Sequence, residues 1–300
     1  MLTNQHIAVI GGDARQLEII RKLTELNADL YLIGFDQLDH GFTGATKCTL
    51  DEVKLNTLDA IVLPVSGTTI EGEVDTIFSN EKVVLTADQL KQTPEHCTIY
   101  SGISNSCLDK MVTEASRTLI RLFERDDVAI YNSIPTVEGT VMMVIQHTDI
   151  TIHQSNIAVL GLGRVGMSVA RTFDALGANV SVGARKPEHI ARITEMGLKP
   201  FHLSDLANQV SNLDVCINTI PVQIVTSQVI AKMPGHTLVI DLASKPGGTD
   251  FRYAEKRGIK ALLAPGLPGI VAPKTAGKII ANVLTQLLIE RSHNGKENTP

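Results

Sequence analysis

The sequence has no tryptophan, and aromatic residues make up only 4% of its 300 residues. It also lacks long apolar stretches, because the first aliphatic run, Ile7–Ile10, ends at a glycine pair and is far shorter than the ~20 residues of a membrane span. An aliphatic interior with few aromatics is typical of parallel sheets buried on both faces, and it disfavours an all-β sandwich. We therefore expect a cytoplasmic α/β protein without a signal peptide or membrane segment.

A cationic surplus is absent as well. The formal net charge is −5, which disfavours a nucleic-acid or polybasic membrane surface, since both need a positive footprint. Neither the cysteines nor the histidines show the spacing of a disulfide framework, a zinc site or a catalytic triad. We predict reduced thiols and no metal at the four cysteines Cys48, Cys97, Cys107 and Cys216.

The second half of the chain shows the clearest pattern. From residue 157 on, short aliphatic runs alternate with amphipathic stretches, which indicates consecutive βαβ units and a doubly wound parallel sheet, a Rossmann domain. Six strands are expected at 157–160, 179–182, 198–201, 213–218, 237–241 and 259–262.

The first half has a similar but weaker pattern, which predicts a flavodoxin-like α/β domain. A helix is expected at 14–27 and strands at 6–10, 29–33, 60–64, 83–86 and 97–101. A chain of 300 residues also fits two α/β domains. We place the N-terminal, substrate-side domain at 1–128 and the dinucleotide domain at 129–300.

Three further helices are expected to connect these domains. A helix at about 104–125, capped by Ser104 or Asn105, should cross from one domain to the other. A second, at about 136–147, should begin in the hinge between the domains, residues 132–139, with Thr136 as its cap. A third, at 273–290, should pack back toward the first domain.

The strongest single motif is the glycine-rich loop that follows the first strand of the second half. In this motif the first glycine permits a tight turn, the second admits a pyrophosphate to the backbone, and the third lets helix and strand pack closely. The helix that follows offers free N–H groups to phosphates. An ordinary glycine-rich turn is the alternative. The predicted cofactor loop consists of Gly161, Leu162, Gly163, Arg164, Val165 and Gly166.

The choice between NADP and NAD depends on the end of the next strand. NAD sites commonly place an acidic residue there for the ribose 2′-hydroxyl, whereas this sequence has Arg185 and Lys186. A basic side chain at that place can pair with a 2′-phosphate, so we expect NADP, with NAD as an alternative. Both residues could also be solvated loop charges.

Other cofactor-lining candidates follow the later strands, since the carboxyl ends of parallel strands meet at one edge of the sheet. Ser244 and Lys245 in the same region could bind the nicotinamide or a substrate carboxylate, although a solvated loop lysine is an equal alternative. The cofactor candidates are Thr219, Ile220, Pro221, Asp241, Ala243 and Pro265, the last in a rigid turn that should close the nicotinamide end.

The opening Gly11-Gly12 turn lacks the G-x-G-x-x-G spacing, so no second nucleotide is assigned to the first domain. Polar residues after a parallel strand are nevertheless candidates for ligand contact. Asp13, Arg15 and Gln16 are therefore substrate-side candidates, or they only cap the following helix. Ser66, in the loop after 60–64, joins them.

The hinge supplies a further group of candidates. Asn132, Ser133 and Thr136 could contact a ligand, with helix capping as the alternative. Glu138 is either a catalytic base or a carboxylate that satisfies N–H groups in the first helical turn.

Several motifs together carry a family resemblance. The adenosylhomocysteine hydrolases and D-2-hydroxyacid dehydrogenases share the two-domain plan, but the glycine-rich opening and the Asp-Leu-Ala-Ser stretch resemble the A subunits of dipicolinate synthase from endospore-forming bacteria. The resemblance runs essentially end to end and rests on residues 11–16 (GGDARQ), 132–139 (NSIPTVEG), 161–166 (GLGRVG), 241–248 (DLASKPGG) and 265–269 (PGLPG).

The resemblance implies oxidation of a dihydrodipicolinate, derived from the hydroxytetrahydrodipicolinate of the lysine pathway, with reduction of NADP. It also implies a flavoprotein-like partner, the B subunit of dipicolinate synthase, and a place in the mother-cell cytoplasm during sporulation. Arg15 would bind a substrate carboxylate, because a guanidinium can donate two parallel hydrogen bonds to it. The catalytic candidates are Asp13, Arg15, Glu138 and Ser244; the substrate-binding candidates are Arg15, Gln16, Ser66, Asn132, Ser133, Thr136 and Lys245.

Two other interpretations remain open at this stage. The same plan serves NAD-dependent 2-hydroxyacid dehydrogenases and hydrolases that retain a nucleotide, although the histidine with an acidic or arginine partner that they need is not evident. A non-catalytic protein that senses nucleotides has the same fold requirements. A homo-oligomer is possible in each case.

Overall fold

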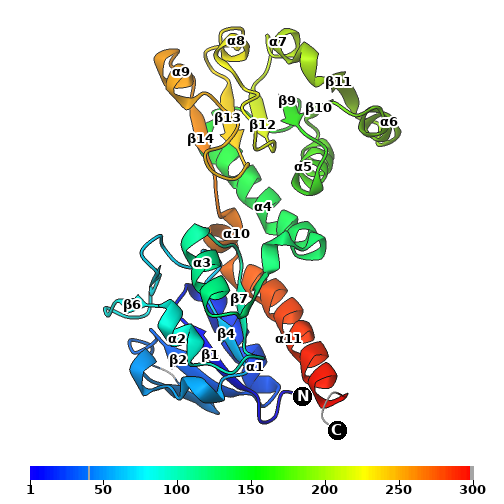
Figure 1. Cartoon of the computed structure of the whole chain (residues 1–300). Helices are drawn as coiled ribbons and strands as arrows, with labels where there is room; N and C mark the ends of the chain where they lie inside the picture. Colours follow the sequence, from blue (N-terminus) through cyan, green and yellow to red (C-terminus); the bar gives the residue numbers. More distant parts are fainter. Residues whose placement is uncertain (40, 298–300) are drawn as a thin grey trace. The chain divides into compact units, whose positions relative to one another are not determined.

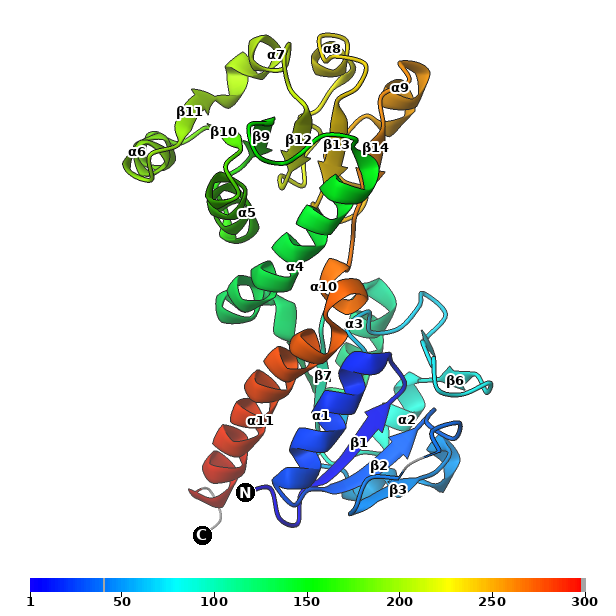
Figure 2. The same ribbon diagram turned by 180° about the vertical axis from the view of Figure 1, so that it is seen from behind.

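The computed structural model describes residues 1–39 and 41–297. Its internal contacts divide the chain into two compact units. The first unit combines Met1–Ala129 with the residues from Ala272 onward, and the second unit is Ile130–Val271. Each unit contains its own six-stranded sheet, shown from two sides in Figures 1 and 2.

The sheet of the first unit is parallel throughout, in the order β3-β2-β1-β4-β7-β8. Without the edge strand β3 this is the flavodoxin order 2-1-3-4-5, and with it the order becomes 3-2-1-4-5-6. The strands are β1 (His6–Ile10), β2 (Asp29–Ile33), β3 (Ala45–Lys47), β4 (Ala60–Val62), β7 (Thr98–Ser101) and β8 (Thr118–Arg121).

The sheet of the second unit has the order β11-β10-β9-β12-β13-β14 and is also parallel. This order is again 3-2-1-4-5-6, as in a Rossmann domain, so the predicted fold class is confirmed. The strands are β9 (Asn156–Leu160), β10 (Asn179–Ala184), β11 (Lys199–His202), β12 (Val215–Asn218), β13 (Leu238–Asp241) and β14 (Ala261–Leu263). The helices are α5 (Arg164–Ala175), α6 (Pro187–Glu195), α7 (Leu206–Gln209), α8 (Ser227–Ile230), α9 (Phe251–Lys256) and α10 (Leu267–Val271).

Both sheets are buried on two faces, which explains their aliphatic strands. In β9, Ile157 and Val159 pack in one core cluster, while Ala158 and Leu160 pack in another on the opposite face. This alternation is the two-residue period of a strand. The four cysteines are free, and burial raises the pKa of the Cys216 thiol, in β12, to about 12.

The helix expected at 104–125 is a different structure. Asn105 caps α3 (Ser106–Glu114) by accepting from the Leu108 amide at 2.9 Å. Ser116 then adopts a positive φ of 53°, which ends the helix, and residues 118–121 form the edge strand β8. A second difference concerns 83–86, where β6 (Val83–Val84) pairs antiparallel with β5 (Glu73–Val74) outside the main sheet.

The hinge helix is longer than expected. α4 (Asp126–His147) begins ten residues before Thr136 and continues through Pro135. The Thr136 hydroxyl therefore does not cap the helix but donates to the Asn132 carbonyl at 2.7 Å. By length and composition alone α4 could cross a membrane, a test that core helices also pass, and its residues Val137 and Val144 are buried in a core cluster of the second unit.

The last helix, α11 (Pro273–Glu297), packs along α1 (Ala14–Glu25) within the first unit, as Figure 1 shows. Gly277 permits this close contact, because a Cβ at this position would lie 2.5 Å from the Arg15 carbonyl oxygen. A larger residue would push the two helices apart.

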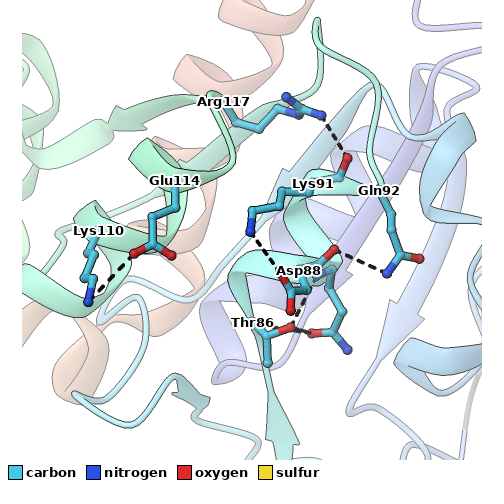
Figure 3. Close-up of polar contacts among 8 residues, drawn as sticks. Thr86, Asp88, Lys91, Gln92, Lys110, Glu114 and Arg117 are labelled. Carbon is cyan, nitrogen blue, oxygen red and sulfur yellow. Dashed lines mark hydrogen bonds and ion pairs between the residues drawn. The ribbon is translucent and has the colours of Figure 1, made fainter.

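Arg117 joins the ends of two short helices of the first unit (Figure 3). Its guanidinium donates to the carbonyl of Lys91, the last residue of α2 (Ala87–Lys91), at 3.2 Å. It also donates to the Thr93 carbonyl at 2.5 Å, after α2, and to the Ala115 carbonyl at 2.6 Å, after α3. The last carbonyls of a helix have no intrahelical partner, so one side chain satisfies both ends.

Candidate functional site

The cofactor loop lies where ligands are expected in a sheet of this order. All six strands of the second unit are parallel, so their carboxyl ends and the loops that follow them share one edge. The strand order reverses between β9 and β12, and the loop 161–166 follows β9 at this point. Open α/β sheets bind their ligands outside such a reversal.

Two of the three glycines in this loop are required by the fold. Gly161 has a positive φ of 98°, and a Cβ there would lie 2.7 Å from the Thr219 hydroxyl oxygen. A Cβ at Gly166 would lie 2.1 Å from the Gly161 carbonyl oxygen. Neither position tolerates a side chain, because the loop, α5 and the end of β12 are in direct contact.

The third glycine, Gly163, is different. It is the exposed N-cap of α5, with φ −85° and ψ −166°, and no side chain of the described chain caps the helix there. A Cβ at Gly163 would meet no atom of the described residues within 4 Å. The helix N-terminus therefore faces open space that its own side chains do not use, and free N–H groups there suit a phosphate.

A buried polar network holds the neighbouring loops. Asp241 is fully buried, and its carboxylate accepts from the Asn218 side-chain amide at 3.0 Å and the Ala243 backbone amide at 3.1 Å. It also accepts from the Gly248 amide at 2.8 Å and the Thr249 hydroxyl at 2.6 Å. The prediction that Asp241 lines the cofactor site needs correction, because these four donors enclose the carboxylate; Asp241 shapes the loops.

The remaining cofactor candidates lie at the same edge. Thr219 donates its hydroxyl to the Leu160 carbonyl at 2.7 Å, which ties β12 to β9. Pro221, Ser244, Lys245 and Pro265 are exposed, Arg164 is also exposed, Val165 and Ile220 are partly exposed, and Leu162 and Ala243 are buried. The expected rigid turn after β14 is followed directly by α10, which begins at Leu267.

Arg185 and Lys186 are exposed immediately after β10. The Lys186 amine lies 3.9 Å from Glu188, an exposed pair worth little in stability. The Arg185 carbonyl contacts the His202 ring at 3.2 Å, from the end of β11. The candidates for a 2′-phosphate are thus close to the sheet edge that carries the glycine loop.

The hinge candidates take separate roles. Ser133 is buried, and its hydroxyl donates to the Ile130 carbonyl at 2.6 Å and lies 2.8 Å from the Ser168 hydroxyl of α5. Ser133 therefore joins α4 to α5, and the ligand-binding prediction for it needs correction. Glu138 is exposed in the middle of α4, not in a first turn.

Asn132 is only 9% exposed, yet neither its amide nitrogen nor its amide oxygen has a hydrogen-bond partner within the described chain. A buried amide without partners is costly, at about 1–3 kcal/mol. The next residue in α4, Ser133, contacts Ser168 of α5, the helix that follows the cofactor loop.

The first unit has its own reversal of strand order, between β1 and β4. There Asp13 caps α1 by accepting from the Arg15 backbone amide at 2.9 Å, and it binds the Arg15 Nε and Nη2 at 2.9 and 2.6 Å. Burial raises the pKa of Asp13, but hydrogen bonds and charge from Arg15 outweigh this, so the pKa is lowered.

Gln16 and Ser66 also belong to this edge. Gln16 is 1% exposed and its amide donates to the Leu63 carbonyl at 3.2 Å, so it links α1 to the end of β4. The prediction that it binds substrate needs correction. Ser66 is exposed.

Two residues of interest were missed by the sequence analysis. Thr68 has a buried hydroxyl without a hydrogen-bond partner in the described chain, in the loop that contains Ser66. His202 contacts the Arg185 backbone. The signal for His202 was its place at the end of the third strand of the unit, next to the strand that precedes Arg185.

Comparisons with known proteins agree with this architecture. Residues 6–123 match the family model for the N-terminal domain of the dipicolinate synthase A subunit, and residues 132–299 match "Alanine dehydrogenase/PNT, C-terminal domain". The chain is 67% identical over 297 residues to the A subunit of dipicolinate synthase from Bacillus subtilis, covering 99% of this chain and 100% of that protein.

Solved structures give the same result. The dipicolinate synthase A chain of Bacillus subtilis matches with a TM-score of 0.95 and 67% identity, over 98% of this chain and 99% of that chain. The corresponding protein from Bacillus halodurans matches with a TM-score of 0.94 and 66% identity, over 96% and 99%. An L-alanine dehydrogenase, 15% identical with a TM-score of 0.61 over 94% and 89%, shares the fold. The second unit is thus a nicotinamide-dinucleotide domain of the dehydrogenase type.

Proposed function

Since the chain belongs to the family of dipicolinate synthase A subunits, we propose that it oxidises a dihydrodipicolinate to dipicolinate and reduces NADP. The observation that carries the proposal is the open, uncapped N-terminus of α5 at Gly163. In this reaction a ring carbon loses a hydride and an adjacent position loses a proton, which leaves an aromatic pyridine dicarboxylate. The aromatic product supplies much of the driving force.

The residues present fit a dinucleotide. The free N–H groups of the first turn of α5 hold the pyrophosphate, and Gly163 leaves room for it. Thr219, Ile220 and Pro221 line the path along the sheet edge, with Ser244 and Lys245 on the next loop. When bound, the cofactor supplies the hydride acceptor.

NADP is the proposed form of the cofactor. No acidic residue directly follows β10, where a carboxylate would bind a ribose 2′-hydroxyl, and two exposed cations stand there instead, Arg185 and Lys186. Their charge favours a 2′-phosphate, because a charge-assisted bond to a phosphate is stronger than a hydrogen bond to a neutral hydroxyl. Arg185→Ala is therefore expected to reduce NADP affinity and leave NAD affinity unchanged.

Arg15 is the proposed ligand of a substrate carboxylate. Asp13 holds the Nε and Nη2 atoms of its guanidinium, and Nη1 has no hydrogen-bond partner within the described chain, so it remains available. For Asp13 we propose a positioning role: it binds the Arg15 guanidinium, and its lowered pKa disfavours a role as proton acceptor. Asn132, with an unpaired amide, is a second proposed ligand.

Glu138 is the proposed proton acceptor, because it is an exposed carboxylate in the middle of α4, the helix that also carries Asn132. A positioned base contributes about 10²–10⁴-fold to the rate. Glu138→Gln should lower kcat by that order and leave the dissociation constant of NADP unchanged. The family of A subunits further supports a second component of the enzyme, and we propose that the chain acts with the flavoprotein-like B subunit.

The test is the absorbance of reduced nicotinamide with the purified full chain, NADP or NAD, and dihydrodipicolinate generated in place from the lysine pathway. A rise with NADP, matched by appearance of pyridine dicarboxylate, is expected. Gly163→Ala, which is expected to retain the fold, should weaken NADP binding and reduce the rise at low NADP concentration. No rise, even with the B subunit added, would contradict the dehydrogenase proposal and favour a nucleotide-sensing role.

A further inference from the structure

The end of β11 lies directly beside the end of β10. In the sheet register His202 is opposite Ala184, the residue that precedes Arg185. The two strands are closely packed here, since a Cβ at Gly183 would lie 2.6 Å from Leu203 and 2.7 Å from Phe201. His202 is exposed at this edge.

The His202 ring contacts two separate segments through its two nitrogens. The Ser204 backbone amide donates to Nδ1 at 3.3 Å, and the Ser204 hydroxyl lies 2.7 Å from the same atom. An atom that accepts from a backbone N–H carries no proton itself, so in the neutral ring the proton is on Nε2. Nε2 then donates to the Arg185 carbonyl at 3.2 Å.

We propose that His202 is a positioning residue for recognition of the 2′-phosphate of NADP, acting through the backbone of Arg185. The inference rests on the proposed function. An exposed cation contributes little when its chain must first be ordered. The hydrogen bond from Nε2 holds the Arg185 backbone at the end of β10. Less conformational entropy is then lost when Arg185 binds the phosphate. Ser204, held by Nδ1, fixes the ring.

A purely structural role is the alternative, because His202 also caps the short 3-10 helix Leu203–Asp205 by accepting from Ser204. Two substitutions separate these roles. In His202→Asn the side-chain oxygen can replace Nδ1 as the cap, but the shorter side chain does not reach Arg185. In His202→Gln the amide nitrogen can replace Nε2 as donor to Arg185.

The experiment is a fluorescence titration of the full chain with NADPH and with NADH, together with thermal unfolding of each variant. His202→Ala and His202→Asn should both weaken NADPH binding about five-fold, the effect of one neutral hydrogen bond, with NADH binding unchanged. His202→Gln should recover most of the NADPH affinity. His202→Asn, which retains the cap, should unfold at a higher temperature than His202→Ala, and Arg185→Ala should lose about ten-fold or more in NADPH affinity, as expected for a bond to a charged group.

Two results would overturn the inference, and they differ from failure of the proposed function. If His202→Asn binds NADPH as tightly as the wild type while Arg185→Ala binds weakly, His202 has only a capping role. If all His202 variants lose NADPH and NADH affinity together, the effect is general and not specific to the phosphate. If the wild type binds NADPH and NADH equally, the proposed NADP preference itself fails, and this inference with it.

Discussion

The glycine loop offers a prediction in which the same substitution, glycine to alanine, affects cofactor binding at one position and stability at another, three residues apart. Gly163→Ala places a methyl group in open space, because no atom of the described residues lies within 4 Å of that Cβ. Its φ of −85° and ψ of −166° are accessible to alanine. Gly166→Ala places the same group 2.1 Å from the Gly161 carbonyl oxygen, a backbone atom that cannot rotate away.

The expected magnitudes differ accordingly. The free energy of unfolding should change by less than about 0.5 kcal/mol in Gly163→Ala, where a poorer cap is offset by a stiffer unfolded chain. In Gly166→Ala it should fall by about 3 kcal/mol, at the upper end of overpacking effects. Affinity for NADPH should fall about 10–100-fold in Gly163→Ala, since the methyl group displaces a phosphate from charge-assisted N–H donors.

The assay combines urea unfolding with NADPH titration of both variants and the wild type. A Gly163→Ala variant that is folded and binds NADPH with wild-type affinity would refute the reasoning, because the pyrophosphate would then not approach this backbone. A Gly166→Ala variant of wild-type stability would refute the packing argument. The two outcomes are independent of each other.

Three further predictions concern stability. Asp241→Asn should lower the free energy of unfolding by about 3 kcal/mol in urea unfolding, since an amide nitrogen must face buried donors, and a wild-type midpoint would contradict this. Arg117→Lys should lower it by about 2 kcal/mol, because an ammonium cannot serve the carbonyls after α2 and α3 together; destabilisation equal to that of a nearby Lys110→Ala control would count against the capping role. Asp13 has a folded pKa below its unfolded value of 3.8, so its contribution to stability is present above that pH and lost as the pH falls through the folded pKa. Carboxyl NMR titration should show the pKa of Asp13 rising in Arg15→Ala, and an unchanged value would contradict the ion pair.

The strand pattern of the second unit was predictable because its central strands β9, β12 and β13 are mostly aliphatic and buried on two faces. The same argument failed for β3 and β8, which lie at sheet edges and carry polar or partly exposed residues. In 104–125, apolar residues at helical spacing also fitted a shorter helix followed by a strand. The residue with positive φ that separates them is Ser116 and not a glycine, so the sequence gives no signal for this turn.

The candidate site was predictable where the backbone dictates the residue type. Gly161 and Gly166 are required by close contacts with Thr219 and with each other. The roles of side chains were harder to predict, because a polar residue after a strand can either contact a ligand or form hydrogen bonds that hold the loops. Asp241 and Gln16 proved to be internal partners, and only their three-dimensional surroundings show it.

The most direct test is a structure of the full chain with NADP bound. We expect the pyrophosphate at the N-terminus of α5 beside Gly163, and the 2′-phosphate beside Arg185. Both units have the same strand order, so the first unit offers an alternative place for a dinucleotide. A dinucleotide bound at the Gly11-Gly12 turn of the first unit, with the Gly163 loop empty, would contradict the proposed cofactor site.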